Sequence, residues 1–465
     1  MIKQIRMINQ LKPETPYTVF QQIKAGDWFT KLSLLIWGLG NLVRRQWIKG
    51  LGFLALEGLA LYYMISFGYN ALLGLPSLGT KEQGEVFNEA KQIYEYVQGD
   101  NSMLILLYGV ITLFIIVGIM IIARAAVKSA YEVEDLSRRG KKIPSFKEEL
   151  RSLLDEKLHK TLLFGPTMGI IIFTIMPLVF MMSMAFTNYD RDHQAPGKLF
   201  DWVGLANFKT ILSMDSAMGK TFWPVLGWTI VWAIFATFLN YFLGMILATV
   251  INRKGTKFKS FWRFIFILSI AVPQFVSLLV MKSMLQPDGA INVLLRELGF
   301  LAAGNSLPFF TNVTWARITV IIVNLWVGIP FTMLITTGVL QNIPTDLYEA
   351  ADVDGANAVL KFFKITLPYM LFVTAPYLIT QFIGNINNFN VIFLLSNGAP
   401  MTSDYYKSTA GKTDLLVTWL YKLTIDNKDY NYGAVIGILV FLISALISLS
   451  VYRRTTAYKN EEGFQ

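Results

Sequence analysis

Residues 348–368 read YEAADVDGANAVLKFFKITLP and lie between two long apolar segments. The preceding Pro-Thr-Asp at residues 344–346 is typical of a helix start. Helical spacing then places four residues on one face: Leu347, Ala350, Ala351 and Asp354. Gly355 permits a sharp change of direction, and residues 358–366 have the pattern of a second short helix. The stretch therefore predicts a short helix, a bend and a return to the next apolar segment, which is more order than a simple connection requires.

The composition is that of a membrane protein. Of the 465 residues, 54% are hydrophobic and 15% are charged, whereas soluble domains carry about 25% charged residues. Segments of about 20 apolar residues can cross a bilayer. The sequence contains eight of them, near residues 48–70, 102–126, 162–187, 222–250, 261–285, 317–340, 367–395 and 432–452. A shorter run at residues 28–43 is expected to form an interfacial helix. The predicted fold class is an all-α polytopic membrane protein.

Lys and Arg are unevenly distributed among the predicted loops. They gather in the N-terminal segment, in the loop 127–160, in the loop after the fourth span and after the eighth span. The loop 71–101 carries mostly Glu and Asp instead. Because cytoplasmic loops are enriched in Lys and Arg, both termini and the loop 341–365 are predicted to be cytoplasmic. This distribution accounts for the net charge of +10, so nucleic acid is not an expected partner.

The sequence offers little for catalysis. The absence of cysteine excludes thiol chemistry and Cys-ligated metals, and no catalytic residue or metal site is expected. A Gly-Lys-Thr tripeptide at residues 411–413 is similar to the end of a phosphate-binding loop, but Tyr406 stands where the first glycine is required. Glu57 and Lys282 are charges within predicted spans, and an ion-coupled transporter would need more such groups.

The fifth, sixth and seventh spans carry small or uncharged polar residues at helical spacing. Eight positions make up the candidate substrate path: Ser277, Asn324, Val327, Gly328, Phe331, Gln381, Asn385 and Asn388. Within the seventh span, Gln381, Asn385 and Asn388 are predicted to share one helical face. Amides donate and accept hydrogen bonds at once, which suits sugar hydroxyls, whereas a charged substrate would need Arg or Lys. The alternative is that these amides only bond helix to helix.

The stretch quoted first resembles the EAA loop of ABC-importer permeases. The matching residues are Glu349, Ala350, Ala351, Asp354, Gly355, Ile365, Leu367 and Pro368. Residues 349–356, EAADVDGA, also fit the EAA-x-x-DGA form of sugar importers. In that family the loop is a coupling helix that sits in a cleft of the cytoplasmic ATPase. The resemblance implies that residues 342–368 form a cytoplasmic coupling loop.

A second resemblance covers roughly residues 161–454 and is to MalF-type permease subunits of maltose/maltodextrin importers. It rests on runs at residues 385–389, 394–400, 413–417 and 432–434. In that family this subunit holds the sugar midway through the membrane, at positions that match Ser277, Asn324, Val327, Gly328, Phe331, Asn385 and Asn388. Phe331 and Val327 depart from the tyrosine and leucine of the family, which leaves the size of the substrate open.

The resemblance also implies a domain organisation and a set of partners. Residues 1–160 would form an N-terminal extension, and residues 161–454 a six-helix type I ABC importer (MetI-like) core, with a transmembrane type-1 domain at about 222–453. The partners would be a second homologous permease, two ATPase subunits, an extracellular sugar-binding protein and the lipid bilayer. The chain itself would bind no cofactor, because the partner ATPase uses the ATP and Mg.

The expected function is that of a permease subunit in the cell membrane that imports oligosaccharides, with maltose or maltodextrin as the first expectation. One alternative is a permease for another oligosaccharide, such as a galacto-oligosaccharide. The alternative from another class is a stand-alone secondary transporter, which would work without an ATPase.

Overall fold

A computed structural model describes residues 18–253 and 255–453 of the chain. Contacts divide the chain into two compact units, Met1–Trp202 and Val203–Gln465. The third membrane helix, Leu158–Met184, thus groups with the first unit, because its last segment contacts the second membrane helix. The contact boundary lies later in the chain than the predicted start of the core at residue 161.

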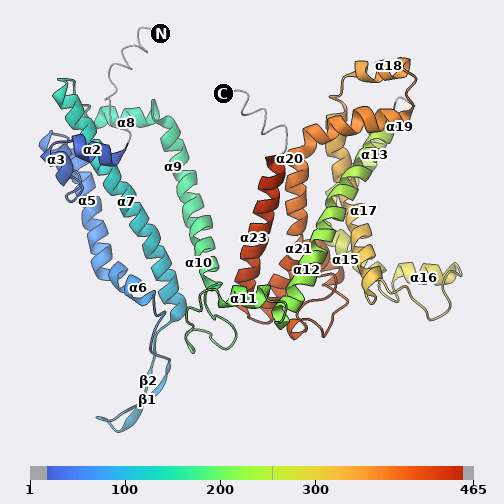
Figure 1. Cartoon of the computed structure of the whole chain (residues 1–465), viewed down its shortest axis with the longest axis horizontal. Helices are drawn as coiled ribbons and strands as arrows, with labels where there is room; N and C mark the ends of the chain where they lie inside the picture. The colour runs from blue at the N-terminus through green and yellow to red at the C-terminus, as the bar shows by residue number, and fades with distance from the viewer. Residues whose placement is uncertain (1–17, 254, 454–465) are drawn as a thin grey trace. The chain divides into compact units, whose positions relative to one another are not determined.

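The first unit contains membrane helices, short helices at one end and a hairpin at the other (Figure 1). Its helices are α2 (Val19–Ala25), α3 (Trp28–Leu32), α4 (Leu39–Val43), α5 (Trp47–Tyr63), α6 (Tyr69–Gly74), α7 (Ser102–Arg138), α8 (Phe146–Leu154), α9 (Leu158–Ile170) and α10 (Met176–Met184). π-helical turns at Met64–Gly68 and Ile171–Ile175 join α5 to α6 and α9 to α10. Strands β1 (Gly84–Asn88) and β2 (Ile93–Val97) pair antiparallel, with Gly84 opposite Val97.

The apolar run at residues 28–43 forms two short helices, so the prediction of one interfacial helix was wrong. Gly38 separates α3 from α4 in the left-handed region, at φ 82°. A Cβ on Gly38 would lie 2.5 Å from the carbonyl oxygen of Gly50, so only glycine fits this bend. Glu134 on α7 is 2% exposed and accepts hydrogen bonds from the Asp27 amide at 2.9 Å and the Thr30 hydroxyl at 2.6 Å. These bonds fix the short helices against α7.

Two segments predicted as loops contain regular structure. Helix α7 continues to Arg138, well into the expected basic loop 127–160. Helix α8 follows within the same loop and begins with a capping box between Ser145 and Glu148. Lys142 and this cap hold the pKa of Glu148 down to about 2. The predicted loop 71–101 contains the β1–β2 hairpin, which the sequence analysis did not predict.

The second unit contains the remaining membrane helices. Its longer helices are α11 (Ala206–Leu212), α12 (Ala217–Ile234), α13 (Asn240–Asn252), α14 (Lys259–Ala271), α15 (Gln274–Met284), α16 (Ala290–Glu297), α17 (Val313–Leu340), α18 (Thr345–Val353), α20 (Leu367–Ile386), α22 (Leu416–Tyr421) and α23 (Tyr430–Tyr452). The shorter helical segments are Phe235–Leu239, α19 (Ala358–Lys361), Phe362–Thr366, α21 (Phe389–Val391), Ile392–Ser396, Tyr406–Ser408 and Lys422–Asp426. Helix α13 packs along α17.

Seven helices among the described residues are long and apolar enough to cross a membrane, and a bent pair gives an eighth candidate. The prediction of about eight spans is therefore confirmed, but the fifth span is not a straight helix. Helices α14 and α15 meet at 87°, because Pro273 lacks an amide N–H and forces the preceding Val272 into an extended conformation. The seventh span ends at Ile386 rather than at residue 395.

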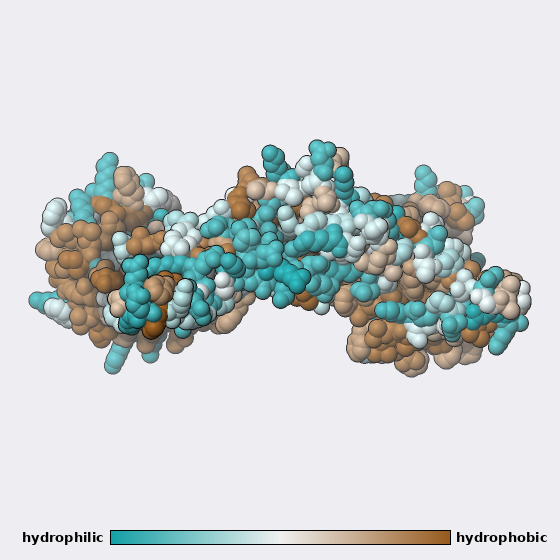
Figure 2. Space-filling model, turned by 90° about the horizontal axis from the view of Figure 1, so that it is seen from below, coloured by the Kyte–Doolittle hydropathy of each residue, from teal (hydrophilic) through white to brown (hydrophobic). Residues whose placement is uncertain are grey.

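Hydrophobic side chains cover much of the flanks of both units in the space-filling view (Figure 2). Large exposed apolar residues occur along α5, α9, α14 and α20, as Leu59, Phe164, Phe264 and Phe372 illustrate. A soluble protein rarely exposes so much contiguous apolar surface. These flanks are suited to contact lipid chains or other membrane helices.

The loop 396–431 closes one end of the second unit around a buried ion pair. The Asp414 carboxylate lies 2.7 Å from the Lys422 ammonium and accepts hydrogen bonds from the Gly411 amide and the Thr418 hydroxyl. Burial raises the pKa of Asp414, and Lys422 opposes this effect. The Lys422 ammonium also donates to the carbonyl oxygen of Asn397 at 2.9 Å, so this segment is folded structure and not a free connection.

Candidate functional site

A small cavity of the second unit lies among the helical segment Phe235–Leu239, α13, α15, α17 and α20. Its volume is about 150 Å³. Its walls are Ala236, Thr237, Asn240, Tyr241, Gln274, Asn324, Val327, Gly328, Phe331, Thr332, Tyr377, Leu378, Gln381, Asn385 and Asn388. Seven of the eight predicted substrate positions are thus brought together, and Ser277 is the exception. No charged side chain lines this cavity.

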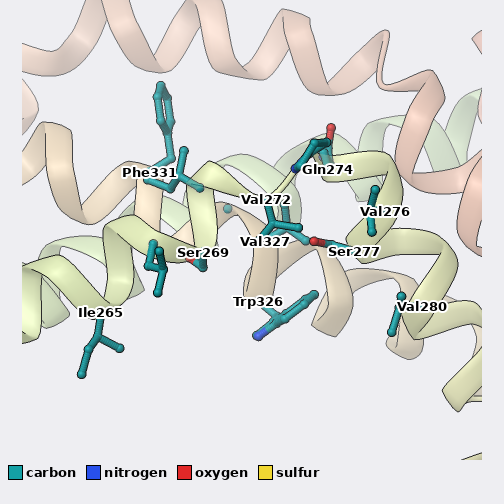
Figure 3. A pocket seen from close by; sticks show the side chains of 14 residues that line it. Ile265, Ser269, Val272, Gln274, Val276, Ser277, Val280, Trp326, Val327 and Phe331 are labelled. Carbon is teal, nitrogen blue, oxygen red and sulfur yellow. The ribbon is translucent and has the colours of Figure 1, made fainter.

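A second, larger cavity of about 810 Å³ opens beside the bent pair α14–α15. Ser277 lines this cavity, and Figure 3 shows it close to Gln274 and Val327. The two cavities share four lining residues: Gln274, Val327, Gly328 and Phe331. The bend before Gln274 therefore brings Gln274 into the walls of both cavities, and all eight predicted positions lie along one continuous set of walls.

Three buried polar atoms of the small cavity have no hydrogen-bond partner. They are Oδ1 of Asn240, Nδ2 of Asn324 and the hydroxyl of Tyr377. Asn240 and Asn324 are 6% and 5% exposed. An unsatisfied buried polar group costs about 1–3 kcal/mol, so such groups in a protein usually bind water or a ligand. One acceptor, one amide donor and one hydroxyl meet here, which is the combination that a neutral ligand rich in hydroxyl groups can satisfy.

Asn385 and Asn388 are partly engaged in bonds within the protein. The Asn385 amide donates to the Thr237 hydroxyl at 3.0 Å, and the Asn388 amide donates to Oδ1 of Asn385 at 3.3 Å. Helix-to-helix bonding, the alternative raised from the sequence, therefore occurs at Asn385. The prediction that Asn388 lies on the same helical face was wrong, because α20 ends at Ile386 and Asn388 caps the next short helix. The cap nevertheless keeps Asn388 beside Asn385.

Gly328 allows α17 to approach α13 closely. A Cβ on Gly328 would lie 2.6 Å from Nδ2 of Asn240. Four residues further along α17, the Thr332 hydroxyl donates to the carbonyl oxygen of Asn240 at 3.0 Å. The glycine and this hydrogen bond together set the position of the Asn240 amide in the cavity wall.

Several polar residues of the cavity were missed in the sequence analysis, among them Thr237, Asn240 and Tyr377. A signal for each was present. Tyr377 precedes Gln381 by four residues, so it belongs to the polar face already recognised on the seventh span. Thr237 and Asn240 are polar residues within a long apolar span, a pattern that marks helix contacts or ligand pathways in membranes.

The predicted coupling loop forms a short helix, a bend and a second helix, as expected. Helix α18 contains Glu349, Ala350 and Ala351, and Asp354 is the C-cap that follows its last residue, Val353. Gly355 follows with φ +73°, and a Cβ there would meet no atom within 4 Å. Glycine is therefore favoured at this position by the positive φ of the backbone and not by a lack of space for a side chain. After the bend, α19 leads through Ile365 into Leu367 and Pro368 at the start of α20.

Helix α18 lies at one end of the second unit, beyond α13 and α19 (Figure 1). Two contacts hold it: the Tyr348 hydroxyl lies 2.8 Å from the Thr366 hydroxyl, and Asp352 pairs with Lys361. None of its residues is buried, and Val353 is 88% exposed. Glu349 is exposed and forms no ion pair with any described residue. A helix that is anchored at its base but uncovered on its outer face is a surface available to a partner.

The helical membrane fold, the internal polar cavity and the exposed loop helix define a membrane transport protein. Residues 240–456 match the family of binding-protein-dependent transport system inner membrane components, and the chain belongs to this family. The galactooligosaccharides transport system permease protein GanP of Bacillus subtilis is 37% identical over 92% of this chain and 98% of its own length. The maltodextrin transport system permease protein MdxF of the same organism is 34% identical over 95% and 98%. MalF of Escherichia coli is 36% identical over 56% of this chain and 50% of its own length.

Solved structures of the same fold support the arrangement of helices. A bacterial ABC transporter that imports the polysaccharide alginate superposes with a TM-score of 0.51 and covers 65% of this chain and 96% of its own. The same transporter in complex with a periplasmic protein bound to an alginate pentasaccharide gives a TM-score of 0.53. Both are 21% identical in sequence, so they show the fold alone. The expected permease fold is confirmed.

Proposed function

We propose that this permease conducts a neutral oligosaccharide, and that the substrate contacts the walls of the small cavity. The observation that carries the proposal is the lining of that cavity: amides, hydroxyls, three polar atoms without partners and no charged side chain. Sugar hydroxyls can supply the missing hydrogen bonds. An ionic substrate would find no opposite charge in these walls, and a buried charge without a partner is costly.

Two sugar classes are candidates for the substrate. One relative that matches nearly the whole chain is named for galactooligosaccharides, and others are named for maltodextrin. The α- and β-linked chains of such sugars present similar hydroxyls but different shapes, so the wall formed by Val327 and Phe331 would select between them. Phe331 is 44% exposed and offers an apolar ring face to the C–H face of a sugar.

Transport would depend on partner subunits. Two ATPase subunits would hydrolyse ATP, and one of them would hold α18 in a cleft of its surface. A second homologous permease would complete the path, and an extracellular binding protein would deliver the sugar. The chain itself would hydrolyse nothing. The loop after α13 is rich in Lys and Arg and lies at the same end of the second unit as α18, which supports a cytoplasmic location for that end. By the same rule, the Lys and Arg of the N-terminal and C-terminal segments favour a cytoplasmic location for both termini.

The test is uptake by the complex reconstituted in vesicles with its binding protein, the second permease and the ATPases. Labelled malto-oligosaccharide and galacto-oligosaccharide are supplied separately, with ATP inside and with or without vanadate. The proposal expects vanadate-sensitive uptake of one of the two sugars and none of a uronic acid oligomer. Uptake of the charged oligomer, or uptake that vanadate does not inhibit, would contradict it.

A further inference from the structure

The first unit contains a cavity that shares no lining residue with the two cavities of the second unit. It has a volume of about 460 Å³. One wall consists of residues 44–46 and the start of α5, residues 47–49. The other consists of residues 143–145, Phe146 at the start of α8, and Glu149. Both segments lie at the end of the unit that carries α2 and α3 (Figure 1).

The cavity lies where the first membrane helix begins. Trp47, Ile48 and Leu51 of α5 are 61%, 59% and 57% exposed, so the apolar surface of the span starts at the cavity. Helix α8 has exposed apolar residues, Phe146 and Leu150 among them, and charged residues in the turns between. Amphipathic helices of this kind lie in the headgroup region of a bilayer, and tryptophan is enriched at the same depth.

The wall of the cavity carries more positive than negative charge. Its charged residues are Arg44, Arg45, Lys49 and Glu149. Lys49 is paired with Glu149 at 2.8 Å, and Arg44 points to Asp27 at 2.6 Å with only 9% of its side chain exposed.

Arg45 is the uncompensated cation of this wall. It is exposed, and its side chain forms no ion pair or hydrogen bond with any residue from 18 to 253 or from 255 to 453. Its φ of 65° lies in the left-handed region, which non-glycine residues rarely adopt and which is found often at ligand sites.

Hydrogen bonds connect the two walls of the cavity. The Gln46 amide donates to the carbonyl oxygen of Pro144 at 3.1 Å and to Glu149 at 3.2 Å. Its own oxygen accepts from the buried Asn41 amide at 2.8 Å. The residues on both sides of Arg45 are therefore fixed, and the cavity is a built feature of the unit rather than a gap between mobile segments.

We propose that this cavity binds the headgroup of an anionic phospholipid. The phosphodiester would contact the Arg45 guanidinium, which is suited to bind two phosphate oxygens at once, while Trp47, Ile48 and Phe146 contact the glycerol and the upper acyl chains. Basic pockets beside membrane helices are recognised sites for anionic lipid headgroups. The site is separate from the sugar path, so it stands independently of which sugar is transported.

The experiment uses the full chain, assembled with its partner subunits in lipid nanodiscs. The probe is phosphatidylglycerol with a photoreactive group on the upper acyl chain, and the same group on phosphatidylcholine is the reference. Labelled peptides are identified by mass spectrometry. The variant Arg45→Gln is compared with Lys147→Gln, because Lys147 is an exposed residue of α8 outside the cavity and loses the same charge.

The expected result is labelling of peptides 44–49 and 143–149 by phosphatidylglycerol and not by phosphatidylcholine. Arg45→Gln should lower the labelling by phosphatidylglycerol about tenfold, because a charge-assisted contact is lost. Lys147→Gln should lower the labelling less than about fivefold, because it removes only one general surface charge. Equal losses of labelling in the two variants would mean that the lipid responds only to general surface charge, and would overturn the proposal. The proposal would also be overturned if phosphatidylcholine labelled the same peptides, or if millimolar inorganic phosphate prevented the labelling by phosphatidylglycerol.

Discussion

Tyr377 and Tyr241 show at the level of single residues why the cavity is a candidate binding site. Both line it, Tyr241 from α13 and Tyr377 from α20. The Tyr241 hydroxyl lies 2.6 Å from the Thr374 hydroxyl, so its hydrogen bond is made within the protein. The Tyr377 hydroxyl is buried and has no partner. The two tyrosines thus form a natural pair for separating a ligand contact from a structural one.

Replacing Tyr377 with Phe removes one hydroxyl and leaves the ring in place. If a sugar hydroxyl is its partner, the apparent affinity for the sugar should fall about 2- to 10-fold, the value of one neutral hydrogen bond. The thermal stability of the complex should not fall, because no bond of the sugar-free protein is lost. Uptake at varied sugar concentration and a thermal unfolding scan measure the two effects.

The control variant is Tyr241→Phe, which breaks the bond to Thr374. It should lower stability by about 1 kcal/mol and leave the affinity for the sugar within about twofold. Equal affinity losses in both variants would mean that the Tyr377 hydroxyl has no specific role.

The sequence was enough to predict which residue types line the cavity. It was not enough to predict whether each polar group is hydrogen-bonded within the protein. Helical spacing was sufficient to bring Gln381 and Asn385 to one place. Whether an amide bonds a neighbouring helix, as Asn385 does with Thr237, or remains free, as Nδ2 of Asn324 does, depends on the distance between helices. The distance between helices depends on packing at residues such as Gly328. The spacing of residues within one segment does not reveal this packing.

Among the elements, α18 is the one whose form most closely follows the sequence. Its start, its length and its bend were all indicated by local signals, because the Pro-Thr-Asp start and the glycine after its end act over a few positions. The bent pair α14–α15 and the two short helices near Gly38 were harder to predict. Hydropathy indicates only that a segment is apolar. It does not predict the direction in which Pro273 or Gly38 turns the chain.

Replacing Gly355 with Leu should weaken binding of the partner ATPase. A side chain at φ +73° costs about 1–2 kcal/mol, and the bend can relieve that cost by tilting α18 away from its position. Pull-down of the ATPase with the purified permease should therefore give a lower yield, while the amount of permease in the membrane stays the same.

Gly299→Leu is the matched control for this variant. Gly299 has φ +77° and open space around its Cβ position, so the backbone cost is the same, but it follows α16 rather than α18. The control should bind the ATPase normally. Normal binding and normal uptake in Gly355→Leu would remove the support for α18 as the coupling element.

At the scale of the whole molecule, the orientation in the membrane can be tested directly. The chain has no cysteine, so a single introduced thiol gives an unambiguous signal. Asn357→Cys lies at the exposed start of α19, and Asp404→Cys lies in the exposed part of the loop 396–431. An impermeant thiol reagent on intact cells should label Asp404→Cys and spare Asn357→Cys.

Disruption of the cells should make both positions reactive, which controls for access. Labelling of Asn357→Cys from outside would place α18 on the extracellular side. It would then be unable to meet an ATPase in the cytoplasm.

The central claim is that the sugar passes the polar wall formed by α17, α20 and the start of α21, and one double variant tests it most directly. Asn385→Leu/Asn388→Leu removes two adjacent amides of that wall, whereas Asn387→Leu changes the intervening residue, which is exposed and does not line the cavity. The measurement is sugar uptake by the reconstituted complex, with ATP hydrolysis in the absence of binding protein recorded alongside. The account predicts that uptake collapses only in the double variant and that this basal hydrolysis persists in both, because α18 is unchanged. Sugar uptake at the normal rate by Asn385→Leu/Asn388→Leu would contradict it.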